Sequence, residues 1–140
     1  MRLIGFNFDK LRVERFKENM PGMKVDTKIE VPSVEEAKSN LLKMKEDLLK
    51  VSFKYEVQYS PEVAKIELGG KIIVAVDSKI AKEALKNWKE TKNEKLEELR
   101  IFVFNLILRK ANIKALELEE EFNLIPHLPL PSFTKEVQKK

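Results

Sequence analysis

The chain has 140 residues, enough for one domain with a hydrophobic core, and its 43% hydrophobic residues lie in the range of globular proteins. It has no cysteine, no stretch as long as a transmembrane helix and no signal-peptide pattern, which excludes disulfide and thiolate chemistry and predicts a cytoplasmic protein without a membrane partner. Charged residues reach 36%, mostly Lys and Glu as in many thermostable proteins, and the net charge of +4 permits an anionic partner without requiring one.

The first predicted element is a long β-strand. Apolar residues alternate from Leu3 to Val13, and the alternation shifts by one position at Asp9-Lys10. Such a shift is typical of a β-bulge or a bend. Residues 19–22 combine Asn, Pro and Gly, which predicts a turn after this strand.

A second strand is predicted over Met23–Val31, where apolar and charged residues alternate regularly. We expect Pro32 to end it, because proline cannot donate a hydrogen bond to a neighbouring strand. The sequence Ser-Val-Glu-Glu that follows resembles a helix capping box. Residues 33–43 are therefore either a short helix or a polar connector.

Two more strands follow. Leu49–Tyr59 alternates without interruption, and Ala64–Val76 keeps its even-numbered positions apolar. Gly69-Gly70 could form a hairpin turn, but the alternation has the same phase on both sides of the pair, which favours one long kinked strand. Clean alternation in several strands predicts an antiparallel sheet with one covered face.

The period then becomes helical. A first helix is predicted from Ser78, with an apolar stripe that extends to Trp88. A second begins at Asn93, a good N-cap, and continues to Phe122, a length of about 45 Å at 1.5 Å per residue. We therefore predict an α+β fold: a four-stranded antiparallel sheet followed by two helices packed on one side, the second long. The domain spans residues 1–133, and 134–140 form a disordered polar tail.

The second helix contains an apolar run over residues 101–108, in which seven of eight side chains are apolar. A helix on one core needs an apolar stripe, whereas this run is apolar on every side. A core helix enclosed within one chain is the alternative, but two helices and one sheet offer little material to enclose it. We predict a homo-oligomer, a dimer or tetramer, with an interface formed by Ile101, Val103, Leu106, Ile107 and Leu108.

No motif predicts catalysis, a metal site or a cofactor. His127 is the sole histidine and has no acid–base partner nearby in the sequence, so we expect a structural role. The acidic residues at 117 and 119–121 follow one another on a helix and diverge, which is typical of a solvated face. Gly69-Gly70 lacks the spacing of a phosphate loop. We expect that the protein is not an enzyme.

Two surface patterns each allow two interpretations. Lysines recur at helical spacing on the first helix, where they could follow nucleic-acid phosphates but more often form a solvated face. The proline-rich segment 126–133 could be a recognition segment, or it could fasten the helix end to its own core. We favour the solvated face and the fastening segment. The lysines are Lys79, Lys82, Lys86 and Lys89; the prolines are Pro126, Pro129 and Pro131; the fastening residues would be Leu128, Leu130 and Phe133.

Three segments also carry a family pattern. Lys65–Val76 alternates acidic and apolar residues, meets the glycine pair and resumes as an apolar strand. Arg100–Ala111 is an apolar helix segment, followed later by Asn-Leu-Ile-Pro at 123–126 and Leu-Pro-Ser-Phe at 130–133. With the order of four strands and two helices, these segments resemble the fourth strand, the long helix and the Asn-Leu-x-Pro ending of the bacterial export chaperone SecB and its relatives.

The resemblance implies an ATP-independent holdase, a tetramer built as a dimer of dimers, that binds unfolded polypeptides in apolar grooves between sheet and helix. This chain is basic whereas the bacterial chaperones are acidic, and the metal-binding tail that some members use for docking is absent from this sequence, so docking on the translocase motor is not expected. Alternative functions are a basic nucleic-acid-binding module and an oligomeric scaffold dedicated to one protein partner. The aromatic residues expected to bind peptide are Phe53, Tyr55, Tyr59, Trp88, Phe102 and Phe104.

Overall fold

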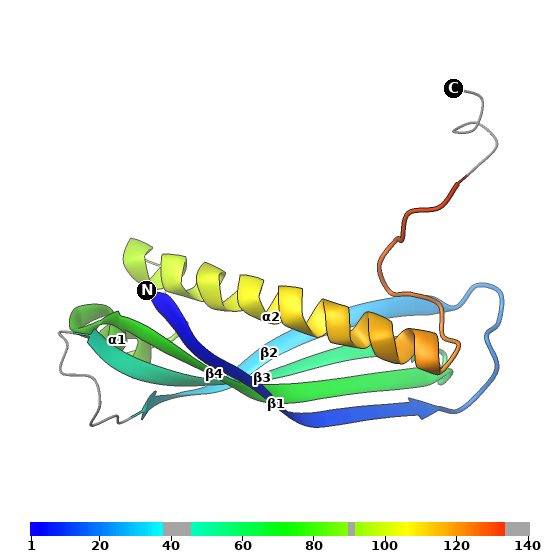
Figure 1. Ribbon diagram of the computed structural model, residues 1–140, viewed down its shortest axis with the longest axis horizontal. Helices are drawn as coiled ribbons and strands as arrows, with labels where there is room; N and C mark the ends of the chain where they lie inside the picture. The colour runs from blue at the N-terminus through cyan, green and yellow to red at the C-terminus, as the bar shows by residue number, and fades with distance from the viewer. Residues whose placement is uncertain (38–45, 90–91, 134–140) are drawn as a thin grey trace.

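The computed structural model describes residues 1–37, 46–89 and 92–133, which form one antiparallel sheet and two helices (Figure 1). The order of strands across the sheet is β1-β4-β3-β2, so β1 and β2 are the edges. The predicted α+β class, four antiparallel strands followed by two helices with the second long, is confirmed. The elements are β1 (Arg2–Arg15), β2 (Lys24–Ala37), β3 (Glu46–Ser60), β4 (Ala64–Asp77), α1 (Ser78–Lys86) and α2 (Glu94–Glu121).

Strands β1 and β4 behave as their alternation predicts. The register between them shifts between Phe8 and Lys10, where the sequence pattern changes phase. Strand β4 continues through Gly69-Gly70 as one strand, paired with β1 on one side and β3 on the other. A Cβ atom on Gly70 would lie 2.1 Å from the Asn7 carbonyl oxygen, so the close approach of β1 requires glycine there.

The prediction for the region after Pro32 is wrong. Strand β2 continues through this proline to Ala37 and stays paired with β3, with a register shift between Glu30 and Ser33. An edge strand tolerates proline at such an irregularity because its outer side needs no hydrogen-bond donor. Residues 33–37 are therefore neither helix nor connector, and residues 38–43 lie outside the described part of the chain.

Helix α2 lies along one face of the sheet, over the central strands β3 and β4 (Figure 1). Residues paired across neighbouring antiparallel strands lie on the same face of the sheet. The pairs in which both residues are apolar lie mostly on this inner face, beneath α2. The inner residues of β3 and β4 are buried, whereas those of the two edge strands are half-buried or exposed. The helix therefore covers the middle of the sheet and leaves an apolar flank along each edge. The apolar row on the inner face of β2 is named the β2 flank and consists of Val25, Ile29, Val31 and Val34.

The helix caps agree with the sequence, but the first helix is shorter than its stripe suggested. Asn93 Oδ1 accepts hydrogen bonds from the backbone N–H groups of Lys95 and Leu96, which confirms the predicted N-cap. Helix α1 ends at Lys86, so Trp88 lies just beyond it and is half-buried against the core.

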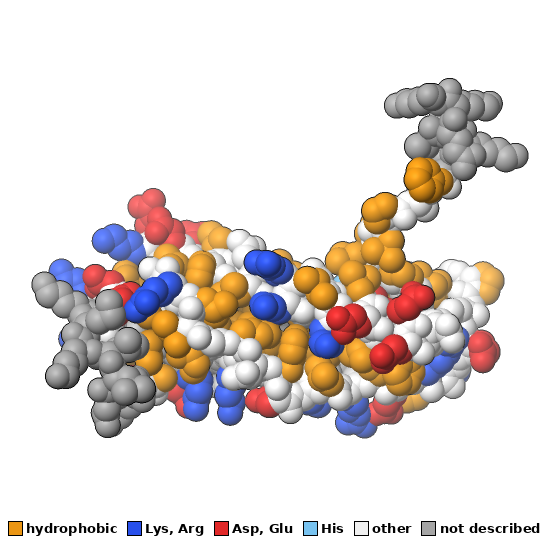
Figure 2. All heavy atoms as spheres, in the orientation of Figure 1, with side chains coloured by type: hydrophobic (Ala, Val, Ile, Leu, Met, Phe, Trp, Pro, Cys, Tyr) orange, Lys and Arg blue, Asp and Glu red, His pale blue; other side chains and the backbone are white. Residues whose placement is uncertain are grey.

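The apolar run on α2 divides between core and surface. Val103 and Ile107 are fully buried in the core of their own chain, and Leu106 is half-buried, whereas Ile101 is 54% exposed and Leu108 is 37% exposed. Figure 2 shows apolar side chains along this helix between charged groups. The outward residues Ile101 and Leu108 are the ones left for a proposed subunit interface, because Val103 and Ile107 already pack against the sheet.

Candidate functional site

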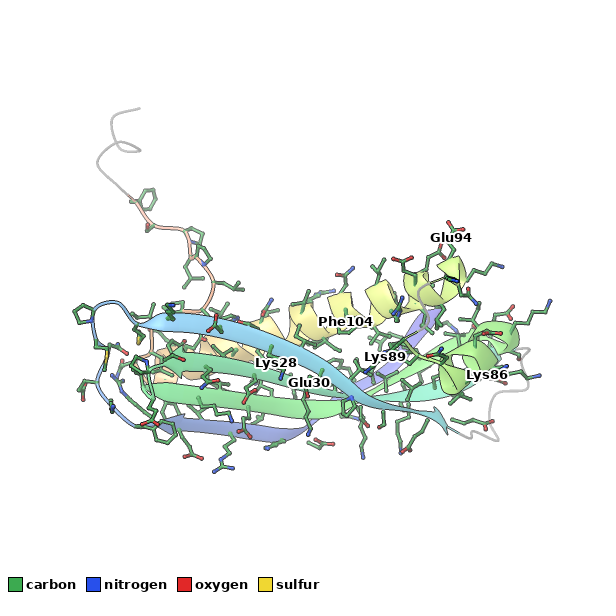
Figure 3. All side chains as sticks on the ribbon, turned by 180° about the vertical axis from the view of Figure 1, so that it is seen from behind. Lys28, Glu30, Lys86, Lys89, Glu94 and Phe104 are labelled. Carbon is green, nitrogen blue, oxygen red and sulfur yellow. The ribbon has the colours of Figure 1, made fainter. Side chains whose placement is uncertain are left out.

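The aromatic residues expected to bind peptide lie in two different environments. Phe53, Tyr55 and Tyr59 point from β3 to the inner face beneath α2 and are 2%, 1% and 0% exposed. Phe102 and Phe104 are half-buried on α2, and Figure 3 shows Phe104 on the helix above the sheet. Within a single chain the β3 aromatics therefore offer no open surface, because β3 is a central strand covered by the helix.

Phe53 has an evident packing role. Its ring centroid lies 5.1 Å from that of Phe6 and 6.0 Å from that of Phe8, and the last two are 5.3 Å apart. The three rings meet on the inner face beside Gly70, which pairs with both Phe8 and Phe53. Gly70 has no side chain and so leaves room for the three rings. The ring cluster stabilises the packing of β1, β4 and β3.

A buried polar cluster joins β3, the last turns of α2 and the segment that follows. The Glu119 carboxylate is fully buried, and both of its oxygens lie within 2.9 Å of His127 Nδ1. The Tyr59 hydroxyl lies 2.8 Å from Glu119 Oε2, and the Tyr55 hydroxyl lies 2.8 Å from His127 Nε2. Asn112 Oδ1 completes the cluster, 2.5 Å from the Tyr55 hydroxyl and 3.1 Å from His127 Nε2. Each of these polar side chains of the cluster thus has a partner.

The electrostatics of the cluster keep both tyrosines neutral. Burial raises the pKa of Tyr55 well above its usual value, and the nearby Glu119 carboxylate raises it further. Burial and the hydrogen bond to Glu119 raise the pKa of Tyr59 in the same direction. Both hydroxyls therefore remain hydrogen-bond donors at neutral pH.

One prediction about this region is wrong, and the premise of another is wrong. Glu119 is buried rather than solvated. His127, whose side chain is 1% exposed, has an acidic partner eight residues earlier in the chain, while its expected structural role stays a prediction. The sequence held one signal for the first: Val103, Ile107, Ala111, Ala115 and Glu119 follow at four-residue spacing, and all five are buried. The sequence held no signal for the pairing of His127 with Glu119, because His127 reaches the helix only after the chain has turned back at Phe122.

The proline-rich segment is fastened, but not by the predicted residues. Leu128, Leu130 and Phe133 are 37%, 54% and 85% exposed, so that prediction is wrong, and Leu124 (5% exposed) is buried instead. Beyond the polar cluster the segment leaves the body of the domain (Figure 1). Asn123 adopts a positive φ of 54° that turns the chain at the end of α2.

The middle of the outer face of the sheet carries mainly charged and polar side chains. A hollow of about 460 Å³ lies over this region, where Gly69 has no side chain, and charged residues of both signs line it. Lys10 and Lys65 lie 2.7 and 3.0 Å from the Glu67 carboxylate and hold its pKa down to about 2. Lys28 pairs with Glu30 at 2.9 Å on β2 (Figure 3). The hollow is largely charge-compensated.

The predicted lysine stripe lies on the surface. Lys79, Lys82 and Lys86 are exposed on α1, and Lys89 is exposed just after it. Figure 3 shows Lys86 and Lys89 near the start of α2, where Glu94 lies. Both interpretations of the stripe, a solvated face and a contact with phosphates, stay open.

Known proteins resemble this chain in structure and not in sequence. No family model and no curated protein matches the sequence. The SecB-like chaperone Rv1957 of Mycobacterium tuberculosis, solved in complex with a ChAD peptide from the antitoxin HigA1 (Rv1956), superposes with a TM-score of 0.55 at 11% identity, over 96% of this chain and 91% of that one. The fold is SecB-like. At this identity the comparison defines the architecture, which agrees with the resemblance of the three sequence segments.

Two further observations concern metal binding and membrane insertion. Within residues 1–37, 46–89 and 92–133, no three His, Asp or Glu side chains converge as a metal site. No helix in the described ranges has both the length and the apolar character needed to cross a bilayer.

Proposed function

We propose that this protein is a SecB-like, ATP-independent chaperone that holds unfolded or partly folded polypeptides. The observation that carries the proposal is the β2 flank, the apolar row Val25, Ile29, Val31 and Val34 beside α2, which its own chain covers only in part. An extended apolar segment can lie along such a flank without sequence-specific hydrogen bonds. The SecB-like neighbour that binds an antitoxin peptide supports a polypeptide as the ligand.

The proposal includes assembly into a dimer or tetramer. Ile101 and Leu108 remain exposed on the outward side of α2. Two large aliphatic side chains on one helix face suit a contact between copies of the chain. Because they are 54% and 37% exposed, covering them would contribute roughly half of the full burial value, about 1 kcal/mol each. Phe102 and Phe104 flank this surface and are candidates for either contact, with the subunit or with the client.

The test is suppression of aggregation of a chemically denatured client, measured by light scattering at stoichiometric chaperone without nucleotide. We expect protection by the native chain and weaker protection by Ile29→Ser, which removes apolar surface from the β2 flank. Lys28→Ser is the matched control, because the neighbouring residue points to the outer face. Folding of each variant is checked by circular dichroism. Absence of protection by the native chain would rule out the holdase.

The lysines of α1 support a second candidate, a nucleic-acid-binding module. Phosphate contacts are strongest at low salt. Fluorescence anisotropy with mixed-sequence DNA and RNA at low ionic strength separates this candidate from the holdase. Binding at low salt that weakens steeply as salt is added favours nucleic-acid binding, and absence of binding at low salt excludes it. A scaffold dedicated to one protein partner would bind neither nucleic acid nor generic clients.

A further inference from the structure

The first residues after α2 are bound to the domain through main-chain groups as well as through two side chains. We call residues 123–127 the strap, and the four side chains that receive it, Tyr55, Tyr59, Asn112 and Glu119, the tyrosine site. The Tyr59 hydroxyl lies 2.5 Å from the Ile125 carbonyl oxygen, and the His127 N–H donates to Glu119 Oε1 at 3.1 Å. These are groups that any extended polypeptide carries.

Two strap side chains add to this binding. Leu124 is 5% exposed against the core, and the His127 ring lies against the Glu119 carboxylate and the Tyr55 hydroxyl. At the root of the strap, Arg15 Nη1 donates to the Phe122 carbonyl oxygen at 2.6 Å. The strap thus fills a site that recognises an extended chain with one apolar side chain and, three residues later, a hydrogen-bond donor.

The tyrosine site adjoins the β2 flank. In the β2–β3 ladder Val25 pairs with Tyr59 and Ile29 pairs with Tyr55, so flank and site share the inner face. Val25 and Ile29 therefore lie beside the two tyrosines. A polypeptide on this part of the flank would lie next to the tyrosine site, whose hydroxyls the strap contacts.

We propose that the tyrosine site is a binding site for an extended polypeptide segment, and that the strap is its resident occupant, which a client displaces. This inference rests on the proposed function. Displacement exchanges the main-chain hydrogen bonds of the strap for those of the client, and the buried Glu119 carboxylate keeps a donor partner. Because the strap is tethered to the domain, it competes with a client at high effective concentration. Only molecules whose strap has left the tyrosine site, the open fraction, bind a client there, so the apparent client affinity is the intrinsic affinity multiplied by this fraction.

Two measurements on the full chain test the proposal. The first is the dissociation constant for a permanently unfolded, fluorescein-labelled client, measured by anisotropy. His127→Ala removes the ring from the strap and is expected to tighten client binding about tenfold by raising the open fraction. Leu130→Ala is the matched control, because that side chain lies beyond the strap and is 54% exposed; it should leave the constant unchanged.

The second measurement reads the strap directly. The chain has no cysteine, so Ile125→Cys, at a side chain that is 49% exposed, accepts one spin label. We expect the label to be immobile without client and to become mobile when unfolded client is added. This readout decides the question even where His127→Ala does not fold.

The outcomes are distinguishable. Tighter binding by His127→Ala or release of the label by client supports the strap as occupant. Client binding that is equal in all folded variants, with a label that stays immobile, overturns this inference and leaves the holdase intact. No client binding by any form overturns the proposed function, and this inference with it.

Discussion

Replacing Gly70 of the Gly69-Gly70 pair should destabilise the packing of β1 on β4, while replacing Gly69 should not. A Cβ atom on Gly70 would lie 2.1 Å from the Asn7 carbonyl oxygen and 3.0 Å from Phe53 Cε1. On Gly69, the nearest atoms would lie 3.5 Å away, which is ordinary van der Waals contact. Neither glycine has a positive φ, so the difference lies in the space available.

The cost of Gly70→Ala follows from that distance. Carbon–oxygen contacts in sheets are about 3.3–3.6 Å, so β1 must move away by more than 1 Å at Asn7. Forcing extra atoms into a packed core costs about 1–3 kcal/mol, and each ladder hydrogen bond lost costs about 1 kcal/mol more. We expect a loss of about 2–4 kcal/mol. Gly69→Ala should be neutral or stabilising by up to about 1 kcal/mol, because alanine loses less entropy on folding.

Thermal unfolding by circular dichroism, at fixed protein concentration, measures both variants. One kcal/mol corresponds to about 2–4 °C for a chain somewhat longer than this one and to more for a shorter one. We therefore expect Gly70→Ala to melt roughly 10 °C lower and Gly69→Ala to melt near the native temperature. Equal melting temperatures for the two variants would refute the steric reasoning.

Three further outcomes are expected. Tyr59→Phe removes the hydroxyl that the buried carboxylate and the strap share, and should lower the free energy of unfolding by about 1–2 kcal/mol in urea denaturation; an unchanged midpoint would contradict this. The lowered pKa of Glu67 means that its two lysine partners stabilise the fold above its usual pKa of 4.5, and that this contribution disappears as the pH falls towards 2. Glu67→Gln should therefore be less stable by at most about 1 kcal/mol at pH 7, since the side chains of Lys10 and Lys65 are 53% and 39% exposed and solvent screens the ion pairs. The variant should equal the native chain near pH 2 in denaturation measured across pH; a pH-independent difference would speak against the ion pairs. The double variant Ile101→Lys, Leu108→Lys should lower the mass by light scattering if α2 joins subunits, whereas Leu85→Lys, at an equally exposed apolar residue on α1, should not.

Parts of the candidate site were within reach of sequence reasoning. The alternation on β3 correctly placed Phe53, Tyr55 and Tyr59 on one face, but it did not tell a covered face from an open one. Whether a face is open depends on the element that packs on it, and α2 starts more than thirty residues after β3 ends. The pairing of Glu119 with His127 likewise required the turn at Phe122.

The amino-acid sequence by itself determined the local elements of this protein. Side-chain period separates strands from helices, a phase shift marks the bulge in β1, and Asn93 starts α2, because each of these depends on residues a few positions apart. Only the tertiary structure decided the strand order, the continuation of β2 through Pro32 and the burial of Glu119 beneath the strap. These depend on contacts between segments distant in the chain, where packing and hydrogen-bond satisfaction outweigh local preference.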